Sequence, residues 1–129
     1  MASPMSRILV VDDSEDICHA LARLLRRCGH DVDAAFDGAA ALASVRSAAP
    51  ELIILDIMMP RMDGLEVLTR LKADGATANV PVVMFSACQD AETMKRALDS
   101  GAIAFWLKAS FNFNELRERV RTLMKQPAA

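Results

Sequence analysis

The sequence lacks any stretch that would carry the protein into a membrane or out of the cell. Its N-terminus, MASPMSRILVVDD, has only a short apolar run before two aspartates, so it cannot form the core of a signal peptide. No segment approaches the roughly 20 consecutive apolar residues that a membrane-spanning helix needs. We therefore expect a cytoplasmic protein that has no membrane partner.

Cysteine is scarce and irregularly spaced. The three cysteines, Cys18, Cys28 and Cys88, form neither a CxxC pair nor the Cys/His spacing of a zinc site. An odd number of cysteines without a metal pattern suits a reducing compartment. We expect Cys18 and Cys28 to be core residues, because an unpaired cysteine usually packs as a small hydrophobe. A redox role for Cys88 is an alternative that no activating neighbour in the sequence supports.

The sequence has no excess of positive charge and no glycine-rich phosphate loop. Its 15 Lys and Arg stand against 17 Asp and Glu, whereas a nucleic-acid partner favours clustered cations. A dinucleotide-binding fingerprint is also missing. A phosphohydrolase with an aspartyl nucleophile typically carries Asp-x-Asp, but the second position is Ser14 counted from Asp12 and Glu15 counted from Asp13. These features argue against nucleic-acid binding, nucleotide enzymes and phosphohydrolases.

What is present suffices for one ordinary soluble domain. The 129 residues are 53% hydrophobic, and a chain of this length buries roughly two thirds of its unfolded surface on folding. It needs no disulfide or metal to hold its core. We expect one domain over residues 6–124, with loose termini at 1–5 and 125–129.

Short β-rich apolar runs alternate with segments of helical periodicity along the chain. The expected strands are RILVV (7–11), DVDAAF (31–36), ELIIL (51–55), PVVMFSA (81–87) and AIAFWL (102–107). The third is the most apolar and is expected to be central. Five strands alternating with five helices imply right-handed crossovers and a parallel sheet covered on both faces. The expected fold class is α/β, a three-layer sandwich.

Cap residues mark the ends of the expected helices. Ser14 and Asp37 are expected N-caps, because short polar side chains accept the free N–H groups of a first turn. Asn112 and Glu115 form a capping-box pattern at the start of the last helix, and Gly29 supplies a stop for the first. The apolar stripe of the last helix is expected to face the sheet: Phe113, Leu116, Val120, Leu123 and Met124. Trp106, the only tryptophan, is expected in the core.

Polar residues follow four of the five expected strands. In open parallel sheets, ligands bind beyond the carboxyl ends of the strands, and these ends carry Asp12, Asp13, Asp56, Ser86 and Lys108. Three carboxylates held together repel one another unless a cation neutralises them, and such oxygen ligands suit Mg²⁺. Any one of these residues alone could be a helix cap or a solvated side chain. Their coincidence at strand ends predicts a divalent-metal site.

Several motifs resemble the receiver domain of two-component response regulators. They are VVDDS, LDIMMPRMDGLEVL, the Ser86-Ala87 pair and the strand that ends at Lys108. Pro60 and Gly64 follow Asp56 by four and eight residues, as in that family. The resemblance covers about residues 6–124. It implies a flavodoxin-like, CheY-like fold with strand order 2-1-3-4-5.

The resemblance also implies a chemistry. Asp56 would accept a phosphoryl group from a histidine kinase, a histidine phosphotransfer protein or a small phosphodonor, with Mg²⁺ as the cofactor. Lys108 and Ser86 would contact the phosphoryl group. The implied metal ligands are Asp12, Asp13, Asp56 and the backbone carbonyl of Met58. Such a domain is not an enzyme on other substrates, because it catalyses only its own phosphorylation and dephosphorylation.

A conformational switch is the further implication. Ser86 would move towards the phosphoryl group and Phe105 would turn inward, which rebuilds the surface of the fourth helix, fifth strand and fifth helix. A downstream protein, an output domain or a second copy of the chain would bind that surface. The arginines of the last helix are either a solvated face or part of this partner surface. The apolar Met58 is poorly suited to orienting an attacking water, which indicates slow self-dephosphorylation.

Two departures from the family pattern affect these expectations. Ala109 replaces the proline that usually follows the lysine, and a cis bond before alanine would cost about 2.5 to 4 kcal/mol, so we expect a trans bond or a strained loop. Phe105 lacks the hydroxyl of the more common tyrosine, so any switch works by packing. The alternative function is a phosphorylation-independent interaction module with the same fold.

Overall fold

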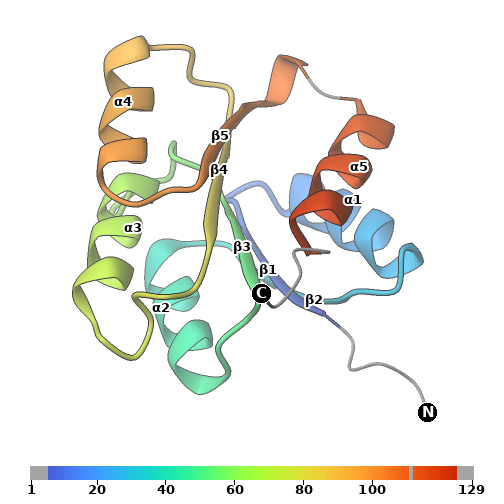
Figure 1. Cartoon of the computed structure of the whole chain (residues 1–129), viewed down its shortest axis with the longest axis horizontal. Coiled ribbons are helices and arrows are strands. Elements are labelled where there is room, and N and C mark those ends of the chain that lie inside the picture. The colour runs from blue at the N-terminus through green and yellow to red at the C-terminus, as the bar shows by residue number, and fades with distance from the viewer. Residues whose placement is uncertain (1–5, 111, 125–129) are drawn as a thin grey trace.

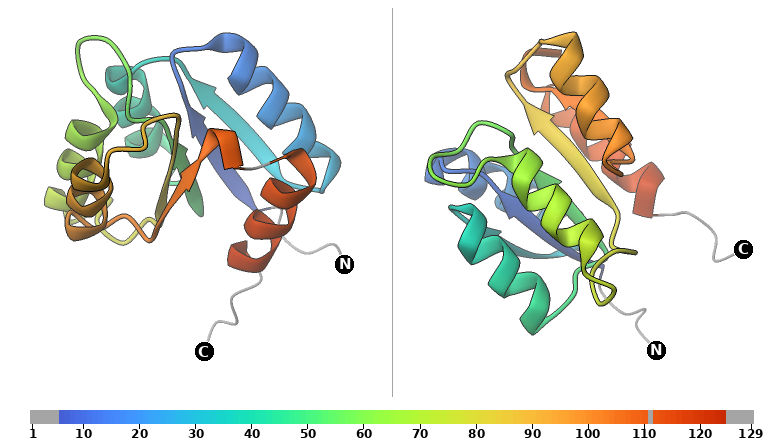
Figure 2. Two further views of the ribbon diagram at one scale, coloured as in Figure 1. Left: turned by 90° about the horizontal axis from the view of Figure 1, so that it is seen from above. Right: turned by 90° about the vertical axis from the view of Figure 1, so that its left-hand side faces the viewer.

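A computed structural model of the chain has five parallel strands between two layers of helices (Figures 1 and 2). It describes residues 6–110 and 112–124, and the termini expected to be loose, 1–5 and 125–129, lie outside the described residues. The strand order β2-β1-β3-β4-β5 confirms both the three-layer α/β sandwich and the predicted order.

The elements follow one another in strict alternation. The strands are β1 (Arg7–Val11), β2 (Asp31–Ala35), β3 (Leu52–Leu55), β4 (Val82–Ser86) and β5 (Ala104–Leu107). The helices are α1 (Glu15–Arg27), α2 (Gly38–Ser47), α3 (Gly64–Ala73), α4 (Ala91–Asp99) and α5 (Phe113–Met124), with a 3-10 turn η1 (Lys108–Ser110) between β5 and α5. The largest boundary difference is at β5, where Ala102 still donates its N–H to Ala97 of α4 and so belongs to the preceding turn.

The predicted caps close the helix ends. The Ser14 hydroxyl accepts the N–H of Ile17 at 3.3 Å, and Asp37 accepts the N–H of Ala40 at 2.7 Å. Asn112 accepts the N–H of Glu115 at 2.8 Å, while the Glu115 carboxylate accepts the N–H of Asn112 at 3.4 Å, which is the capping box read from the sequence. These bonds satisfy donors that a helix cannot satisfy internally.

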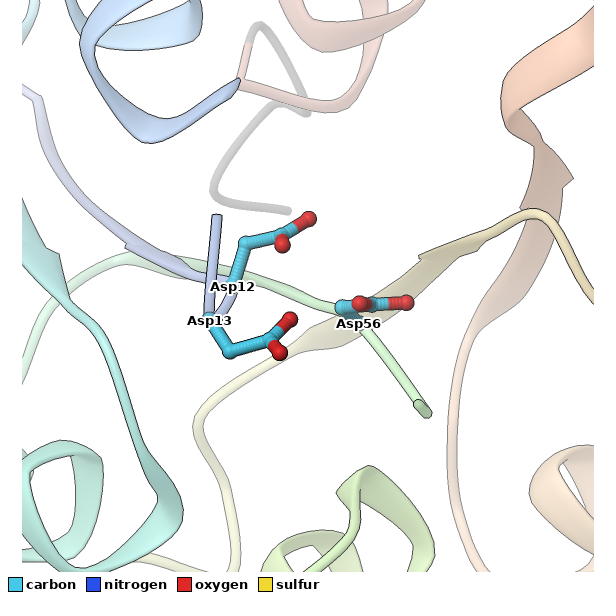
Figure 3. Close-up of side chains that lie close together, drawn as sticks. All are labelled: Asp12, Asp13 and Asp56. Atoms are coloured by element: carbon cyan, nitrogen blue, oxygen red, sulfur yellow. The ribbon is translucent and has the colours of Figure 1, made fainter. Parts of the chain in front are cut away.

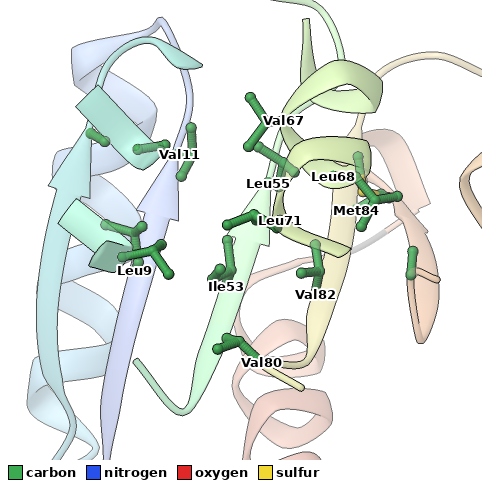
Figure 4. Packing of buried hydrophobic residues seen from close by; sticks show 14 of the residues in the cluster. Leu9, Val11, Ile53, Leu55, Val67, Leu68, Leu71, Val80, Val82 and Met84 are labelled. Atoms are coloured by element: carbon green, nitrogen blue, oxygen red, sulfur yellow. The ribbon is translucent and has the colours of Figure 1, made fainter. Parts of the chain in front are cut away.

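The hydrophobic core has two halves, one on each face of the sheet. Helices α1 and α5 cover one face and α2, α3 and α4 cover the other (Figure 1). Figure 4 shows the second half, in which Leu68 and Leu71 of α3 pack against Ile53 and Leu55 of β3. All four residues of β3 are buried, as its unbroken apolar run predicted. Each such side chain contributes about 1.5 to 3 kcal/mol on burial, so the strand that precedes Asp56 is firmly held.

Two core predictions are wrong. Cys28 is exposed, because it follows the last residue of α1, where the chain turns away at Gly29 with φ of 97°. Phe113 is 58% exposed, because it opens α5 beyond the end of β5. The other predicted members of the α5 stripe are buried or partly buried against the sheet, and Cys18 and Trp106 are buried as expected.

None of the described helices is long and apolar enough to cross a membrane.

Gly64 holds the loop after β3 close to the sheet. Its N–H donates to the carbonyl of Ile57 at 2.9 Å, and a Cβ at this position would overlap the carbonyl oxygen of Asp56. That Cβ would also lie 2.8 Å from the Cα of Ile57. Only glycine therefore allows the first turn of α3 to pack against the end of β3.

We expect Gly64→Ala to lower the free energy of unfolding by at least about 2 kcal/mol, because the backbone atoms that it meets cannot move aside. Urea denaturation checks this. Gly75→Ala is the matched control, since a Cβ there meets nothing within 4 Å. A Gly64→Ala variant as stable as Gly75→Ala would contradict the close packing described here.

Candidate functional site

Three carboxylates meet where β1 and β3 end. The register pairs Val11 with Leu55, so the residues that follow, Asp12 and Asp56, leave the sheet side by side, and the N–H of Asp56 donates to the carbonyl of Val11 at 2.9 Å. Figure 3 shows Asp12 and Asp13 directed towards Asp56. One oxygen from each of the three carboxylates lies within 4.8 Å of the others. The site is thus a direct result of parallel pairing between two neighbouring strands.

Lys108 inserts a positive charge into this cluster. Its Nζ donates to Asp12 Oδ2 at 2.7 Å and lies 3.5 Å from Asp56 Oδ2. The side chain is only 20% exposed, so water screens these ion pairs weakly. One ammonium against three carboxylates still leaves the group with a formal charge of −2.

The turn after Lys108 keeps this geometry without proline. Among the described residues no peptide bond is cis, so the Lys108–Ala109 bond is trans, as predicted. The chain passes directly into η1, and the lysine side chain reaches the carboxylates from there. The replacement of proline by Ala109 has therefore not removed the cation from the site.

The three carboxylates differ in burial and in hydrogen bonding. Asp12 and Asp56 are buried, and Asp13 is exposed. Asp12 Oδ1 accepts the N–H of Ser14 at 2.9 Å, and Asp56 Oδ1 accepts the N–H of Met58 at 3.4 Å. Asp13 is therefore the carboxylate that meets solvent, and Asp56 is the one held between the sheet and its own loop.

The pKa of the Asp56 carboxyl lies above the ordinary aspartate value. Burial raises this pKa most, and the neighbouring charge of Asp12 raises it further. Lys108, the N–H of Met58 and a hydrogen bond with the Ser86 side chain lower this pKa in part. A buried carboxylate with a perturbed pKa and a specific cation beside it is the arrangement expected at a functional site.

Ser86 contacts this cluster, whereas Phe105 lies within β5. Ser86 is fully buried, and its hydroxyl accepts the N–H of Cys88 at 3.2 Å in addition to bonding Asp56. Phe105 is partly buried and packs against the half of the core under α2, α3 and α4. Met58 follows Asp56 in the loop, and its side chain is 63% exposed.

Cys18 contacts the backbone of the acidic site, which the sequence did not indicate. Its thiol donates to the backbone carbonyl of Asp12 at 3.3 Å, and burial, followed by the charge of Asp12, raises the pKa of Cys18 to about 11. Cys18 thus stays protonated and braces the turn between β1 and α1. The usual packing of an unpaired cysteine predicted its burial, but no sequence signal predicted this contact.

The donor set fits a magnesium ion. Oxygen ligands about 2.1 Å from Mg²⁺ in octahedral geometry lie about 3.0 Å apart in cis and about 4.2 Å apart in trans positions, and one oxygen of each of these carboxylates lies within 4.8 Å of the others. Asp13 gives an ion access from solvent, and the formal charge of −2 favours a divalent cation.

Comparison with known proteins identifies the family. The model of the response regulator receiver domain matches residues 8–121. The chain belongs to this family. It is 37% identical over 122 residues to the DNA-binding dual master transcriptional regulator RpaA of a Synechocystis strain, and 39% identical over 123 residues to the transcriptional regulatory protein PrrA of Mycobacterium leprae. Each alignment covers 95% of this chain.

This receiver domain also matches solved structures. The chemotaxis protein CheY4 of Vibrio cholerae superimposes with a TM-score of 0.86 at 28% identity, over 93% of this chain and 99% of that one. The CheY-like fold implied by the sequence motifs is therefore confirmed. This chain spans about half the length of the two curated relatives, 50% of RpaA and 52% of PrrA.

Family membership establishes the general role. The chain is a receiver domain of the kind found in response regulators of two-component systems. Response regulators receive phosphoryl groups from kinases and act on downstream partners, and receiver domains typically bind Mg²⁺ at an acidic pocket. Here the acidic pocket is formed by Asp12, Asp13 and Asp56.

The raised pKa of Asp56 predicts a pH-dependent stability. Folding favours the protonated carboxyl, so the free energy of unfolding falls as the pH rises from the ordinary aspartate pKa through the raised one. Because Asp56→Asn removes the buried charge, we expect this variant to melt at a higher temperature than the wild type at neutral pH without metal. The difference should disappear at pH values below the ordinary aspartate pKa.

Thermal unfolding followed by circular dichroism, in a buffer containing a metal chelator, measures this difference. Asp13→Asn is the matched control, since this exposed carboxylate should change the unfolding temperature less. A lower melting temperature for Asp56→Asn than for the wild type at neutral pH would contradict the assignment of Asp56 as a destabilising buried charge.

Proposed function

We propose that this receiver domain is a phosphorylation switch in which Asp56 is the phosphoacceptor. The observation that carries the proposal is the position of Asp56, buried beside two other carboxylates with the Lys108 ammonium 3.5 Å from its Oδ2. A nucleophile needs an accessible lone pair and a stable orientation. The Met58 N–H holds one carboxylate oxygen, which leaves the other to attack.

The proposed reaction is an in-line transfer to the Asp56 carboxylate. A carboxylate oxygen of Asp56 attacks the phosphorus of a phosphohistidine or of a small phosphodonor. The bond from phosphorus to the donor nitrogen or oxygen breaks, and its electron pair leaves with the donor. The product is an acyl phosphate on Asp56. Positioning and electrostatics supply most of the catalysis of phosphoryl transfer, which a small site can provide.

Charge balance explains why the site needs cations. The phosphoryl group carries a charge of about −1.5 to −2, and it enters a group that already has a formal charge of −2. Lys108 supplies one positive charge beside Asp56. Asp12, Asp13, Asp56 and the backbone carbonyl of Met58 would hold Mg²⁺, which neutralises phosphoryl oxygens.

The proposed switch starts at Ser86. Its buried hydroxyl bonds both Asp56 and the backbone of the loop after β4. Phosphoryl oxygens on Asp56 would compete for this hydroxyl, and the loop would follow because Ser86 is tied to the N–H of Cys88. Phe105 of β5, which is neighbour to β4 in the sheet and only partly buried, would then move further inward.

The surface formed by α4, β5 and α5 is the proposed output. Leu98 and Ile103 are 47% and 49% exposed there, so an apolar contact is available to a downstream protein, an output domain or a second copy of the chain. The positive charge of α5 is partly neutralised within the helix, because Arg117 and Arg121 both pair with Glu118. The chain would catalyse only its own phosphorylation and dephosphorylation, and would not be an enzyme on other substrates. It would do so in the cytoplasm.

We expect acetyl phosphate with Mg²⁺ to add one phosphoryl group to the wild type and none to Asp56→Asn, because only the first has the nucleophile. Intact mass spectrometry measures the adduct. Lys108→Ala should form it roughly 100-fold more slowly, since one charge-stabilising donor is lost. An unmodified wild type with an intact fold would instead favour the phosphorylation-independent interaction module.

We expect the phosphoryl group to be long-lived, because the apolar side chain of Met58 cannot orient an attacking water. Met58→Asn places a hydrogen-bonding group at the mouth of the site, and the lifetime should shorten about fivefold, the effect of one ordinary hydrogen bond on a rate. A phosphate-release assay gives the lifetimes. Equal lifetimes in wild type and variant would defeat this account of Met58.

A further inference from the structure

Met58 has the most exposed large apolar side chain of the described residues. It is 63% exposed, whereas the next, Phe113, is 58% exposed. The remaining methionines that the structure describes are buried or partly buried: Met59, Met62, Met84, Met94 and Met124. The susceptibility of a methionine to oxidation increases with its exposure. Peroxide should therefore react with Met58 before the other described methionines.

The loop around Met58 is fixed by backbone hydrogen bonds. The N–H of Met58 donates to Asp56 Oδ1, and the N–H groups of Met59 and Gly64 both donate to the carbonyl of Ile57, at 3.1 and 2.9 Å. Met59 buries its side chain in the core, 8% exposed, while its neighbour Met58 stays in solvent. The Met58 backbone is thus held beside Asp56, and its exposed side chain extends from this loop into solvent.

Oxidation would change the chemistry of this side chain. A thioether sulfur is a weak hydrogen-bond acceptor, whereas a sulfoxide carries a polar oxygen. A polar oxygen at the mouth of the site accepts hydrogen bonds from water, which the thioether does poorly. We infer that Met58 is a modification site through which peroxide shortens the life of the phosphoryl group on Asp56. This inference rests on the proposed function.

The modification step is balanced. A lone pair of the Met58 sulfur attacks one oxygen of hydrogen peroxide, and the O–O bond breaks. The oxygen now bound to sulfur loses its proton, and the departing hydroxide takes up a proton and leaves as water. The sulfur loses two electrons and the peroxide gains them. Methionine sulfoxide reductases reverse this change, so the control is reversible. Hydrolysis of the acyl phosphate still consumes one water and returns the Asp56 carboxylate and inorganic phosphate.

Two cysteines must be removed for a clear test. Cys28 is exposed and Cys88 is partly buried two residues beyond Ser86, so both can react with peroxide. Cys18 can remain, because it is buried and its thiol donates to the carbonyl of Asp12. The experiment therefore uses the full chain with Cys28→Ser and Cys88→Ser, with Met58 or with Met58→Leu.

Each protein is treated with hydrogen peroxide to an average of one added oxygen, phosphorylated with acetyl phosphate and Mg²⁺, and freed of donor. Peptide mass mapping locates the oxygen, and intact mass follows the decay of the phosphoryl adduct. We expect Met58 to be the main oxidised residue among the described methionines and the decay to be about fivefold faster than in the untreated sample. The Met58→Leu protein should decay at the same rate before and after peroxide, and a sulfoxide reductase should restore the slow decay in the Met58 protein.

Three results would overturn the inference. Preferential oxidation of another described methionine would remove Met58 as the modification site. Oxidised Met58 with unchanged decay, or an equal peroxide effect in the Met58→Leu protein, would remove the control of lifetime while leaving the proposed function intact. Absence of a phosphoryl adduct on the untreated protein would refute the proposed function itself, and the inference with it.

Discussion

Repulsion among carboxylates at the end of two adjacent strands is the constraint on which the site depends. Asp12 and Asp56 are both buried, and Asp13 lies within reach of them, so their charges can neither spread apart nor be screened fully by water. Lys108 offsets one charge, and the raised pKa of Asp56 shows that the balance still disfavours the anion. An added cation would therefore stabilise the site, and the proposed phosphoryl group would increase the need for one.

The rest of the fold keeps these charges together. β3 is buried along its whole length, Gly64 lets α3 pack onto the loop after Asp56, and Cys18 braces the backbone of Asp12. Each of these contacts involves buried groups, which are close-packed and move little. The acidic residues thus sit on rigid supports, as a site whose function is electrostatic requires.

The other side of the site is built differently. Ser86 is buried but is bonded to a loop, Phe105 is partly buried, and Met58 is largely exposed. This is the side on which the proposed switch would act, while β1 and β3 would stay in place. The same asymmetry leaves the apolar Met58 side chain exposed two residues after Asp56, which is the basis of the proposed effect on phosphoryl lifetime.

Much of this could be predicted from the chain because the signals were local. The alternation of apolar runs gave the strands, Ser14, Asp37 and the Asn112/Glu115 pair marked helix starts, and the unbroken run of β3 indicated a central strand. The clustering of acidic residues followed from one general rule, that the carboxyl ends of parallel strands meet at one edge. The strand order itself came from the family resemblance, and the topology agrees with it.

What the tertiary structure decided depends on distances between segments far apart in the sequence. No local pattern shows that Lys108 lies closer to Asp12 than to Asp56. Nor does one show that the Cys18 thiol bonds to the Asp12 carbonyl, or that the Phe113 side chain is exposed. The sequence by itself determined which chemical groups stand at the strand ends, because the residue that follows each strand is fixed by the order of the chain. Only packing determined how near those groups come and which of them meet water, because both depend on the sheet register and on the helices that cover it.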